Sequence, residues 1–309
     1  MKKVLIATDK PFAKVAVDGV RNIIEKAGHE LVLLEKYTTH QELIDAAAKA
    51  DAMIIRSDKA DKEVINNSNT LKIIVRAGAG FDNIDLEACT AKGIVAMNTP
   101  GQNSNAVAEL VMGMLVYLAR NGFDGSAGTE LKGKKLGLHA FGYIGKIVAR
   151  IAQGFGMEVY AYSPSLSKNP ERGKEFGVIG VKTPEELYDK CDIVSLHMPA
   201  NADTKGSINY DLMSRMPENG IVINTARKEV INESDMVKIM NERPKFKYAT
   251  DIQPGNHDEM VQKFGNRYLA SAKKCGAQTS EANINAGLAA ANQIVAFFKT
   301  GDETFRVNK

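Results

Sequence analysis

Short apolar runs alternate with amphipathic segments along nearly the whole chain, and this alternation limits the fold more than any other feature. Buried strands that alternate with helices along the chain form parallel sheets, because each helix returns the chain to the same end of the sheet. The amphipathic segments repeat apolar residues at helical spacing. The first part of the chain contains the runs Val4 to Ala7, Leu31 to Glu35, Ala52 to Arg56, Leu71 to Arg76 and Ile94 to Met97. The sequence therefore predicts an α/β fold.

One interruption divides this alternation into two series. Residues 98–101 include a Pro-Gly pair, and a long helix-compatible stretch from Ser104 to Arg120 follows them. The second series of strands is Lys135 to His139, Glu158 to Tyr162, Ile193 to His197, Ile221 to Asn224 and Tyr248 to Asp251. A last helical pattern, Glu281 to Lys299, is expected to rejoin the first series. We predict two Rossmann-like, doubly wound parallel-sheet domains with a ligand cleft between them. Residues 1–99 plus 285–309 form a flavodoxin-like substrate domain, and residues 100–284 bind a dinucleotide.

Charge and composition argue against several classes of function. A formal net charge of +3 is too small for a phosphate-neutralising surface, so no nucleic acid partner is expected. The longest apolar stretch, Leu110 to Ala119, is shorter than the roughly 18 residues that cross a bilayer. The 3 cysteines are scattered without metal-ligand spacing and suit a reducing compartment. We expect a cytoplasmic protein with no membrane segment and no metal site.

A glycine-containing turn lies between a predicted strand and a predicted helix, at residues 140–145. In dinucleotide-binding turns one glycine lets the backbone approach a pyrophosphate, and a later one lets the helix pack on the strand. Free N–H groups at the start of the helix face the anion. Gly142 and Gly145 fill these two places, and Ala140 stands where a first glycine is usual. The predicted cofactor contacts of this turn are Gly142, Tyr143, Ile144 and Gly145.

The end of the following strand bears on the choice of cofactor. An acidic residue at that position usually binds the ribose 2′-hydroxyl and repels a 2′-phosphate, but this chain has Ser163 there. Lys168 and Arg172 follow and are candidates to reach a phosphate. We therefore expect NAD as the cofactor, with NADP left open.

Four further motifs follow one another in order: Arg76 to Asp85, Asn98 to Gly101 with Asn103, Ser195 to Pro199, and Asn224 to Arg227. Together they resemble the signatures of the D-2-hydroxyacid dehydrogenase family, over nearly the whole chain. The chain is most similar to the family's short phosphoglycerate dehydrogenases, in which a pair like Arg56-Ser57 grips a phosphate. This resemblance implies NAD(P)-dependent oxidation of D-3-phosphoglycerate to 3-phosphohydroxypyruvate, the first step of serine biosynthesis. It also implies that no regulatory domain follows.

The resemblance also implies a role for individual residues. Arg227 would hold the substrate carboxylate and polarise the C2 oxygen, and its permanent charge and planar fork suit that task. The residues expected to bind the phosphorylated hydroxyacid are Arg56, Ser57, Arg76, Ala77, Gly78 and Asn103. On the cofactor side the resemblance adds Ser163, His197, Met198, Pro199, Thr225, Ala226, Asp251, Gly276 and Ala277.

The proton acceptor departs from the family pattern, because Lys274 stands where most members have a histidine. A lysine must lose its proton before it acts as a base, and we expect burial beside Arg227 to favour the neutral amine. The glutamate that usually supports the histidine is also missing, with Gln253 in that region. We interpret the two losses as linked, since a carboxylate would favour the ammonium form. His257 lies nearby in the sequence and is an alternative acid-base group.

Two other functions remain open at this point. A glyoxylate or hydroxypyruvate reductase would need no phosphate site, so Arg56 discriminates between the two enzymes. A dinucleotide-sensing binding protein without turnover would fit the missing histidine, whereas Arg227 opposes it. The resemblance further implies a homodimer, with the helix Ser104 to Arg120 and the loop Asp124 to Glu130 as contacts. That helix is apolar on more than one face, which fits either an interface or a core.

Overall fold

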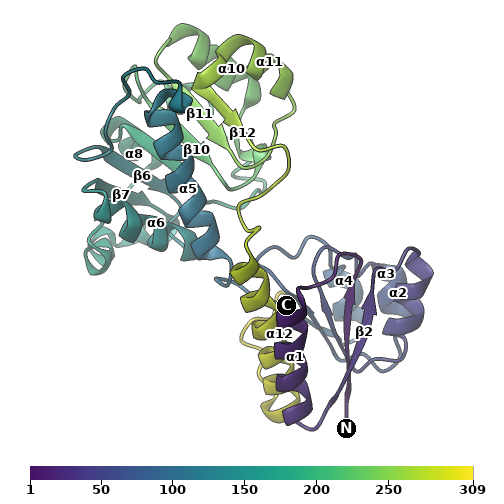
Figure 1. The fold of residues 1–309 in the computed structure, drawn as a ribbon. Coiled ribbons are helices and arrows are strands. Elements are labelled where there is room, and N and C mark those ends of the chain that lie inside the picture. Colours follow the sequence, from purple (N-terminus) through teal and green to yellow (C-terminus); the bar gives the residue numbers. More distant parts are fainter. Residues whose placement is uncertain (309) are drawn as a thin grey trace. The chain divides into compact units, whose positions relative to one another are not determined.

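The structure is a computed structural model that describes residues 1–308, and it separates into two compact units (Figure 1). The first unit contains residues 1–103 and the segment that begins at residue 278, and the second contains residues 104–277. Each unit has its own parallel sheet covered by helices. Both chain ends therefore belong to the first unit, as the N and C marks show.

The first unit is built on a five-stranded sheet in the order β2-β1-β3-β4-β5, in which all neighbours are parallel. Its strands are β1 (Lys3–Thr8), β2 (Glu30–Glu35), β3 (Ala52–Ile55), β4 (Ile73–Arg76) and β5 (Val95–Asn98). Its helices are α1 (Lys14–Lys26), α2 (His40–Ala47), α3 (Lys62–Asn67), α4 (Leu86–Ala91) and α12 (Ser280–Thr300). Polar N-cap side chains begin α2, α3, α4 and α12 by accepting a backbone N–H of the first turn.

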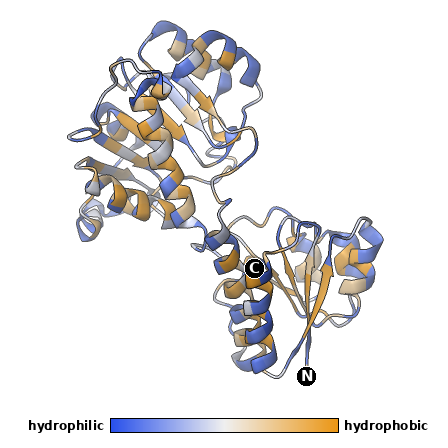
Figure 2. Ribbon diagram, viewed as in Figure 1, coloured by the Kyte–Doolittle hydropathy of each residue, from blue (hydrophilic) through white to orange (hydrophobic). Residues whose placement is uncertain are grey.

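The side chains of β1 alternate between two cores on opposite faces of this sheet. Val4 and Ile6 pack under α1 and α12, which lie side by side, whereas Leu5 and Ala7 pack under α2, α3 and α4. Such alternation is what a strand buried on both faces requires. Figure 2 shows the same arrangement in colour, with largely hydrophobic strands and helices that carry a hydrophilic outer side.

The second unit has a seven-stranded sheet in the order β12-β11-β10-β9-β6-β7-β8, again parallel throughout. Its strands are β6 (Lys135–His139), β7 (Glu158–Tyr162), β8 (Ile179–Gly180), β9 (Ile193–Leu196), β10 (Ile221–Asn224), β11 (Lys247–Thr250) and β12 (Tyr268–Ala270). Its helices are α5 (Ser104–Ala119), α6 (Tyr143–Gly154), α7 (Pro164–Lys168), α8 (Pro184–Lys190), α9 (Tyr210–Met213), α10 (Glu233–Glu242) and α11 (His257–Phe264). α5 and α6 cover one face, and α8 to α11 cover the other.

The predicted parallel α/β fold is confirmed, and the predicted strands agree with the observed ones to within a residue or two at each end. The strands β8 and β12 were not predicted from the sequence. These strands have 2 and 3 residues and lie at the two edges of the second sheet, so neither is long enough to show a hydrophobic period.

Helix α5 is mostly core of the second unit. Both apolar sides of the helix find partners within the unit, since α5 packs against α6 and against strands of the sheet. Its buried residues are Ser104, Ala106, Val107, Ala108, Val111, Met112, Met114, Leu115, Leu118 and Ala119. Its apolar character on more than one face is therefore accounted for without a second subunit.

No helix within residues 1–308 is both long and apolar enough to cross a membrane. In the same part of the chain, no group of three or more His, Cys, Asp and Glu side chains gathers in a way that could hold a metal ion.

Candidate active site

The glycine turn of the second unit has the geometry of an anion-binding loop. Gly142 is the N-cap of α6, and a side chain added to it would meet no atom within 4 Å. A Cβ on Gly145 would lie 2.8 Å from the carbonyl oxygen of Ala140, so only glycine lets the first turn of α6 approach the strand this closely. The turn thus leaves open space in front of the helix start, where free N–H groups favour a phosphate.

Ala140 takes the conformation that a glycine would have in this turn. Its φ is +81°, in the left-handed region that L-residues rarely adopt, while its N–H donates to the carbonyl of Tyr162 at 2.8 Å. Substituting alanine for the usual first glycine therefore leaves the turn intact but places strain in it.

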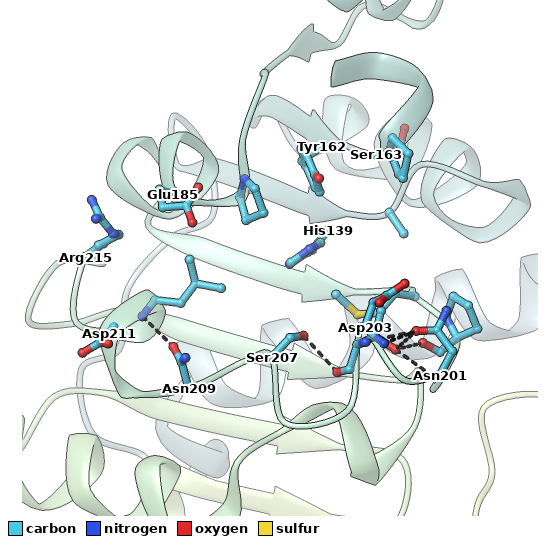
Figure 3. Close-up of a pocket in the computed structure, with 17 residues that line it drawn as sticks. His139, Tyr162, Ser163, Glu185, Asn201, Asp203, Ser207, Asn209, Asp211 and Arg215 are labelled. Atoms are coloured by element: carbon cyan, nitrogen blue, oxygen red, sulfur yellow. Dashed lines mark hydrogen bonds between the residues drawn. The ribbon is translucent and has the colours of Figure 1, made fainter. Parts of the chain in front are cut away.

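A cavity of about 660 Å³ lies beside this turn (Figure 3). In the figure His139 occupies the centre, with Tyr162 and Ser163 on one side and Asn201, Asp203 and Ser207 on the other. Three predicted cofactor residues line the cavity: Ser163, Met198 and Pro199. The space is ample for a nucleoside, which agrees with a role for this side of the sheet in dinucleotide binding.

Two histidines at this edge are held in the neutral form by burial. The pKa of His139 is lowered to about 4, chiefly by burial, and its Nδ1 lies 3.3 Å from the hydroxyl of Tyr188. The pKa of His197 is lowered to about 3 by burial and by the neighbouring His139. Both ring nitrogens of His197 are buried and have no hydrogen-bond partner within residues 1–308. Neither ring carries a charge near neutral pH.

The hydroxyl of Ser163 already has hydrogen-bond partners within the second unit. Its hydroxyl caps α7 by accepting the N–H of Leu166 at 3.2 Å, and it lies 3.0 Å from the Ser165 hydroxyl. Lys168 and Arg172, the candidates for a 2′-phosphate, are exposed and do not line the cavity. The charged side chains that do line it are Glu185, Asp203, Asp211 and Arg215.

Arg227 follows β10 in a loop that the buried side chain of Asn224 holds in place. Oδ1 of Asn224 accepts the N–H of Ala226 at 3.0 Å, and its Nδ2 donates to the carbonyl of Arg227 at 3.0 Å. The hydroxyl of Thr225, between them, is buried and has no partner in the described part of the chain. The loop therefore presents Thr225, Ala226 and Arg227 in one fixed arrangement.

Lys274 and Arg227 meet on a single carbonyl oxygen. Nζ of Lys274 and Nη1 of Arg227 each donate to the oxygen of Ala226 at 3.0 Å. The motifs placed these two residues 47 positions apart in the chain, and the fold of the second unit brings their charged ends together. The two residues predicted to hold the substrate carboxylate and to accept the proton thus meet in one small region.

The surroundings of Lys274 correct the expectation drawn from the sequence. Its side chain is 42% exposed rather than buried, and a carboxylate is present after all, because Oδ1 of Asp251 lies 3.3 Å from Nζ. Asp251 itself is only 1% exposed, and its Oδ2 accepts the N–H of Gly276 at 3.1 Å. No motif predicts this pair, and the sequence analysis places Asp251 and Gly276 on the cofactor side. Ala277 follows in the same loop.

His257 belongs to a hydrogen-bonded chain of its own. It is the first residue of α11, and its Nδ1 and Nε2 lie 3.0 Å from the Tyr268 hydroxyl and 3.0 Å from Nε2 of Gln253, respectively. Both ring nitrogens thus have partners other than Lys274. The role of His257 as an acid-base group stays a hypothesis without a contact that supports it.

In the first unit, the predicted phosphate pair Arg56-Ser57 follows β3 and is fixed by a buried carboxylate that the sequence analysis missed. Asp58, 5% exposed, accepts the N–H groups of Asp9 at 2.7 Å and Arg56 at 3.3 Å, and the hydroxyl of Tyr37 at 2.6 Å. Burial and this carboxylate hold the pKa of Tyr37 well above its usual value. The ends of three neighbouring strands are thereby tied to one side chain.

The predicted substrate loop of the first unit is bound to the same region. Nε of Arg76 donates to the carbonyl of Arg56 at 3.0 Å, and Asn83 donates to that carbonyl at 3.2 Å. Gly78 has φ +154°, and a side chain there would collide with the Arg76 guanidinium, so the loop requires glycine. Ala77 before it is buried. The guanidinium of Arg56 lies 5.4 Å from the centre of the Phe12 ring.

Asn103, the last predicted substrate residue, falls in the first unit at its boundary with the second. Its Oδ1 is buried and has no partner within residues 1–308. The structure thus groups the predicted residues into two sets, one at the strand ends of each unit.

Comparison with known proteins identifies the family of the chain. Residues 111–266 match the family model described as D-isomer specific 2-hydroxyacid dehydrogenase, NAD binding domain. The solved structure of cofactor (NAD⁺)-bound 3-phosphoglycerate dehydrogenase from Entamoeba histolytica is 47% identical, with a TM-score of 0.88, and the match covers 100% of this chain and 99% of that one.

Curated relatives extend the likeness over the length of the chain. The D-3-phosphoglycerate dehydrogenase of Homo sapiens is 33% identical over 100% of this chain and 58% of its own length. That of Methanocaldococcus jannaschii is 34% identical over 88% of this chain and 54% of its own length. The chain therefore spans a little over half the length of the curated relatives it matches.

Proposed function

The chain belongs to the D-isomer-specific 2-hydroxyacid dehydrogenase family, and from this premise we propose that it oxidises D-3-phosphoglycerate to 3-phosphohydroxypyruvate with NAD, the first step of serine biosynthesis. The relatives named above are phosphoglycerate dehydrogenases, one of them in complex with NAD⁺. The observation that carries the proposal is the meeting of Arg227 and Lys274 on the Ala226 carbonyl.

The residues of the second unit fit the cofactor. Open space before Gly142, the tight approach at Gly145 and the adjoining 660 Å³ cavity suit a pyrophosphate and a nucleoside. Buried polar atoms without partners at Thr225 and His197 give a ligand two further groups to bind. When bound, the nicotinamide ring would accept a hydride from C2 of the substrate.

The protein's own residues would handle the charge and the proton. Arg227 would bind the substrate carboxylate and stabilise negative charge on the C2 oxygen. Lys274, as a neutral amine, would take the proton of the C2 hydroxyl while the C2–H bond breaks, and so would become an ammonium. In the reverse direction the ammonium would return that proton to the ketone oxygen.

The strand ends of the first unit would bind the phosphate end of the substrate. Arg56 has its backbone fixed by Asp58 and its guanidinium next to Phe12, so it is organised before a ligand arrives. Ser57, Arg76, Ala77, Gly78 and Asn103 complete the proposed substrate set. We assign substrate binding to the first unit and dinucleotide binding to the second on these grounds.

We also propose that the protein works as a cytoplasmic homodimer. The scattered, free cysteines Cys89, Cys191 and Cys275 suit a reducing compartment. The segment 124–130 follows α5, is exposed throughout, and lies next to Phe123, which is 65% exposed. An exposed aromatic beside an extended loop is a suitable contact for a second copy. Analytical ultracentrifugation of the wild type and of Phe123→Ser tests this assignment, and a wild-type monomer would refute it.

The function is tested by following reduced nicotinamide in the presence of phosphoglycerate and either NAD or NADP. We expect turnover with NAD. Arg56→Ala should raise KM for phosphoglycerate about 10-fold to 100-fold, because one charge-assisted contact to the phosphate is lost, and should leave kcat largely unchanged. Reduction of glyoxylate at the same rate by the wild type and by Arg56→Ala would instead identify a reductase. Dinucleotide binding without any turnover would identify a sensing protein.

A further inference from the structure

Two of the three N–H groups of the Lys274 ammonium donate hydrogen bonds to acceptors in the second unit. One points to the carbonyl oxygen of Ala226 at 3.0 Å and the other to Oδ1 of Asp251 at 3.3 Å. An ammonium has three donors, whereas a neutral amine has two donors and one lone pair. If both acceptors keep their hydrogen bonds when the proton leaves, the lone pair must take the third direction.

The two acceptors are themselves held rigidly. The carbonyl of Ala226 belongs to the loop that Asn224 clamps on both sides. Asp251 is 1% exposed, accepts the N–H of Gly276 through Oδ2, and accepts the N–H of Cys275 through its backbone oxygen at 3.3 Å. A Cβ on Gly276 would lie 2.5 Å from Oδ2 of Asp251, so glycine is needed for this contact.

We infer that Asp251 is a positioning residue for Lys274: together with the Ala226 carbonyl, it aims the third direction of the Lys274 nitrogen at the substrate hydroxyl. This inference rests on the proposed function and deepens it, because it states how a flexible side chain without the family's histidine geometry is oriented. Gln253 stands in the region where most family members have a supporting glutamate, and its side chain lies within hydrogen-bond distance of His257. Asp251 supplies the carboxylate from the end of β11.

The two hydrogen bonds give the arrangement a measurable consequence. Nζ of Lys274 donates to the carbonyl of Ala226 and to Asp251, whereas the neighbouring Lys273 is exposed. A reagent that attacks the lone pair of the amine must approach Lys274 from the one remaining direction. Lys274 should therefore react more slowly than Lys273 at any one pH.

A labelling experiment on the wild-type protein tests this pair without relying on turnover. Brief pulses of acetic anhydride at one pH modify only free amines, and fragment-ion mass spectrometry separates the two neighbouring lysines. We expect Lys274 to be labelled about 10-fold more slowly than exposed Lys273, because its amine is held by two acceptors. Equal labelling rates for the two lysines would overturn the inference, and this comparison needs no variant to fold.

Asp251→Asn tests the same pair by removing the charge with little change of shape. Labelling of Lys274 relative to Lys273 should become faster in this variant, because one of the two acceptors that hold the amine is weakened. The value of kcat for phosphoglycerate oxidation should fall about 10-fold or more with a smaller change in KM, because orientation acts on the proton transfer. Asp258→Asn, which replaces an exposed carboxylate of α11, is the matched control and should change neither the labelling ratio nor kcat.

The outcomes separate this inference from the proposed function. Turnover that depends on Lys274 but keeps its kcat in Asp251→Asn would overturn the role of Asp251 and leave the function in place. A labelling rate of Lys274 that responds to Asp251→Asn, in a protein that does not oxidise phosphoglycerate, would support the contact and refute the proposed reaction. The dissociation constant of NAD, measured for each variant, shows whether a loss of activity arises from cofactor binding instead.

Discussion

Within residues 1–308 each unit buries one carboxylate side chain near the carboxyl ends of its strands, and the two carboxylates have different partners. Asp58 in the first unit accepts the N–H groups of Asp9 and Arg56 and the hydroxyl of Tyr37. Asp251 in the second unit accepts the N–H of Gly276 and the ammonium of Lys274. Both are almost fully buried, at 5% and 1% exposure. The difference lies in the partner that gains and loses a proton.

This difference separates a structural carboxylate from the one that we propose to take part in the chemistry. The donors of Asp58 keep their protons throughout the physiological range, since the pKa of Tyr37 is raised well above its usual value. Its hydrogen bonds therefore fix three loops and do not change during a reaction. The partner of Asp251 is 42% exposed and can reach a ligand. Burial alone does not identify a functional carboxylate, whereas a titratable and accessible partner does.

The largest expected effect comes from removing the titratable partner. Lys274→Ala should lower kcat about 10²-fold to 10⁴-fold, because a positioned proton acceptor contributes that much to oxidation. Steady-state kinetics with phosphoglycerate at pH 9 measures the loss. Lys273→Ala, the exposed neighbour, is the control and should keep its activity. A kcat for Lys274→Ala close to that of the wild type would mean that both buried carboxylates are structural, and the comparison would fail.

The structural half of the comparison is tested by Asp58→Asn. An amide would turn an NH₂ group toward donors that now meet a carboxylate oxygen, so the variant should lose about 1–3 kcal/mol of unfolding free energy. Urea unfolding followed by circular dichroism measures it. Asp45→Asn, an exposed carboxylate of α2, should stay within about 0.5 kcal/mol of the wild type.

Kinetics of the same variant sharpen the contrast with Asp251. Because Asp58 holds the backbone of Arg56, KM for phosphoglycerate should rise in Asp58→Asn. The pH dependence of kcat should not move, since no proton passes through this cluster. A shifted kcat profile would show that Asp58 is coupled to the chemistry and would erase the distinction between the two carboxylates.

Buried imidazoles give the second unit an expected sensitivity to acid. Burial lowers the pKa of His139 to about 4 and of His197 to about 3, whereas both should titrate near 6.5 in the unfolded chain. The unfolded chain therefore binds protons that the folded one excludes. Stability should be complete above about pH 6.5 and fall as the pH drops toward the folded-state values, by roughly 1.4 kcal/mol per unit for each ring.

Replacing one of these rings tests the expectation. His197→Gln should reduce the slope of unfolding free energy against pH between about pH 6 and pH 4, measured by urea unfolding at each pH, whatever its effect on stability at pH 8. A slope identical to that of the wild type would mean that His197 does not stay neutral in the folded protein.

The sequence predicted the two sheets because their central strands are continuous apolar runs. The edge strands β8 and β12 were missed because they depend on pairing with their neighbours, Tyr160 with Ile179 and Tyr248 with Tyr268, rather than on a pattern of their own. Local sequence cannot reveal a strand of two or three residues whose only support is the strand beside it.

The site shows a similar division between what motifs carry and what folding adds. The motifs predicted Arg227 and Lys274 as catalytic residues and Arg56 as a substrate-binding residue. The contacts that organise these cations join Asp251 to Lys274 and Tyr37 to Asp58, 23 and 21 positions apart. Such pairs arise from the order of strands in each sheet. The prediction that Lys274 is buried was wrong for the same reason, because the exposure of its side chain depends on how the folded loop packs and not on the local sequence.

The smallest expected effect concerns one positive-φ turn in each unit. Gly78 in the first unit is a glycine, whereas Ala140 in the second has φ +81° although it carries a side chain. Ala140→Gly should remove about 1–2 kcal/mol of strain from the folded state. The greater entropy of glycine in the unfolded chain offsets part of this gain, so the free energy of unfolding should rise by about 0.5 kcal/mol. Thermal unfolding should show a rise in Tm of about 1–2 °C with unchanged KM for NAD. Gly142→Ala in the same loop is the contrasting variant, because it fills the open space before α6 and should raise KM for NAD with little loss of stability. A lower Tm for Ala140→Gly would mean that the alanine methyl group contributes packing that outweighs the strain, and that the second loop is adapted to its substitution.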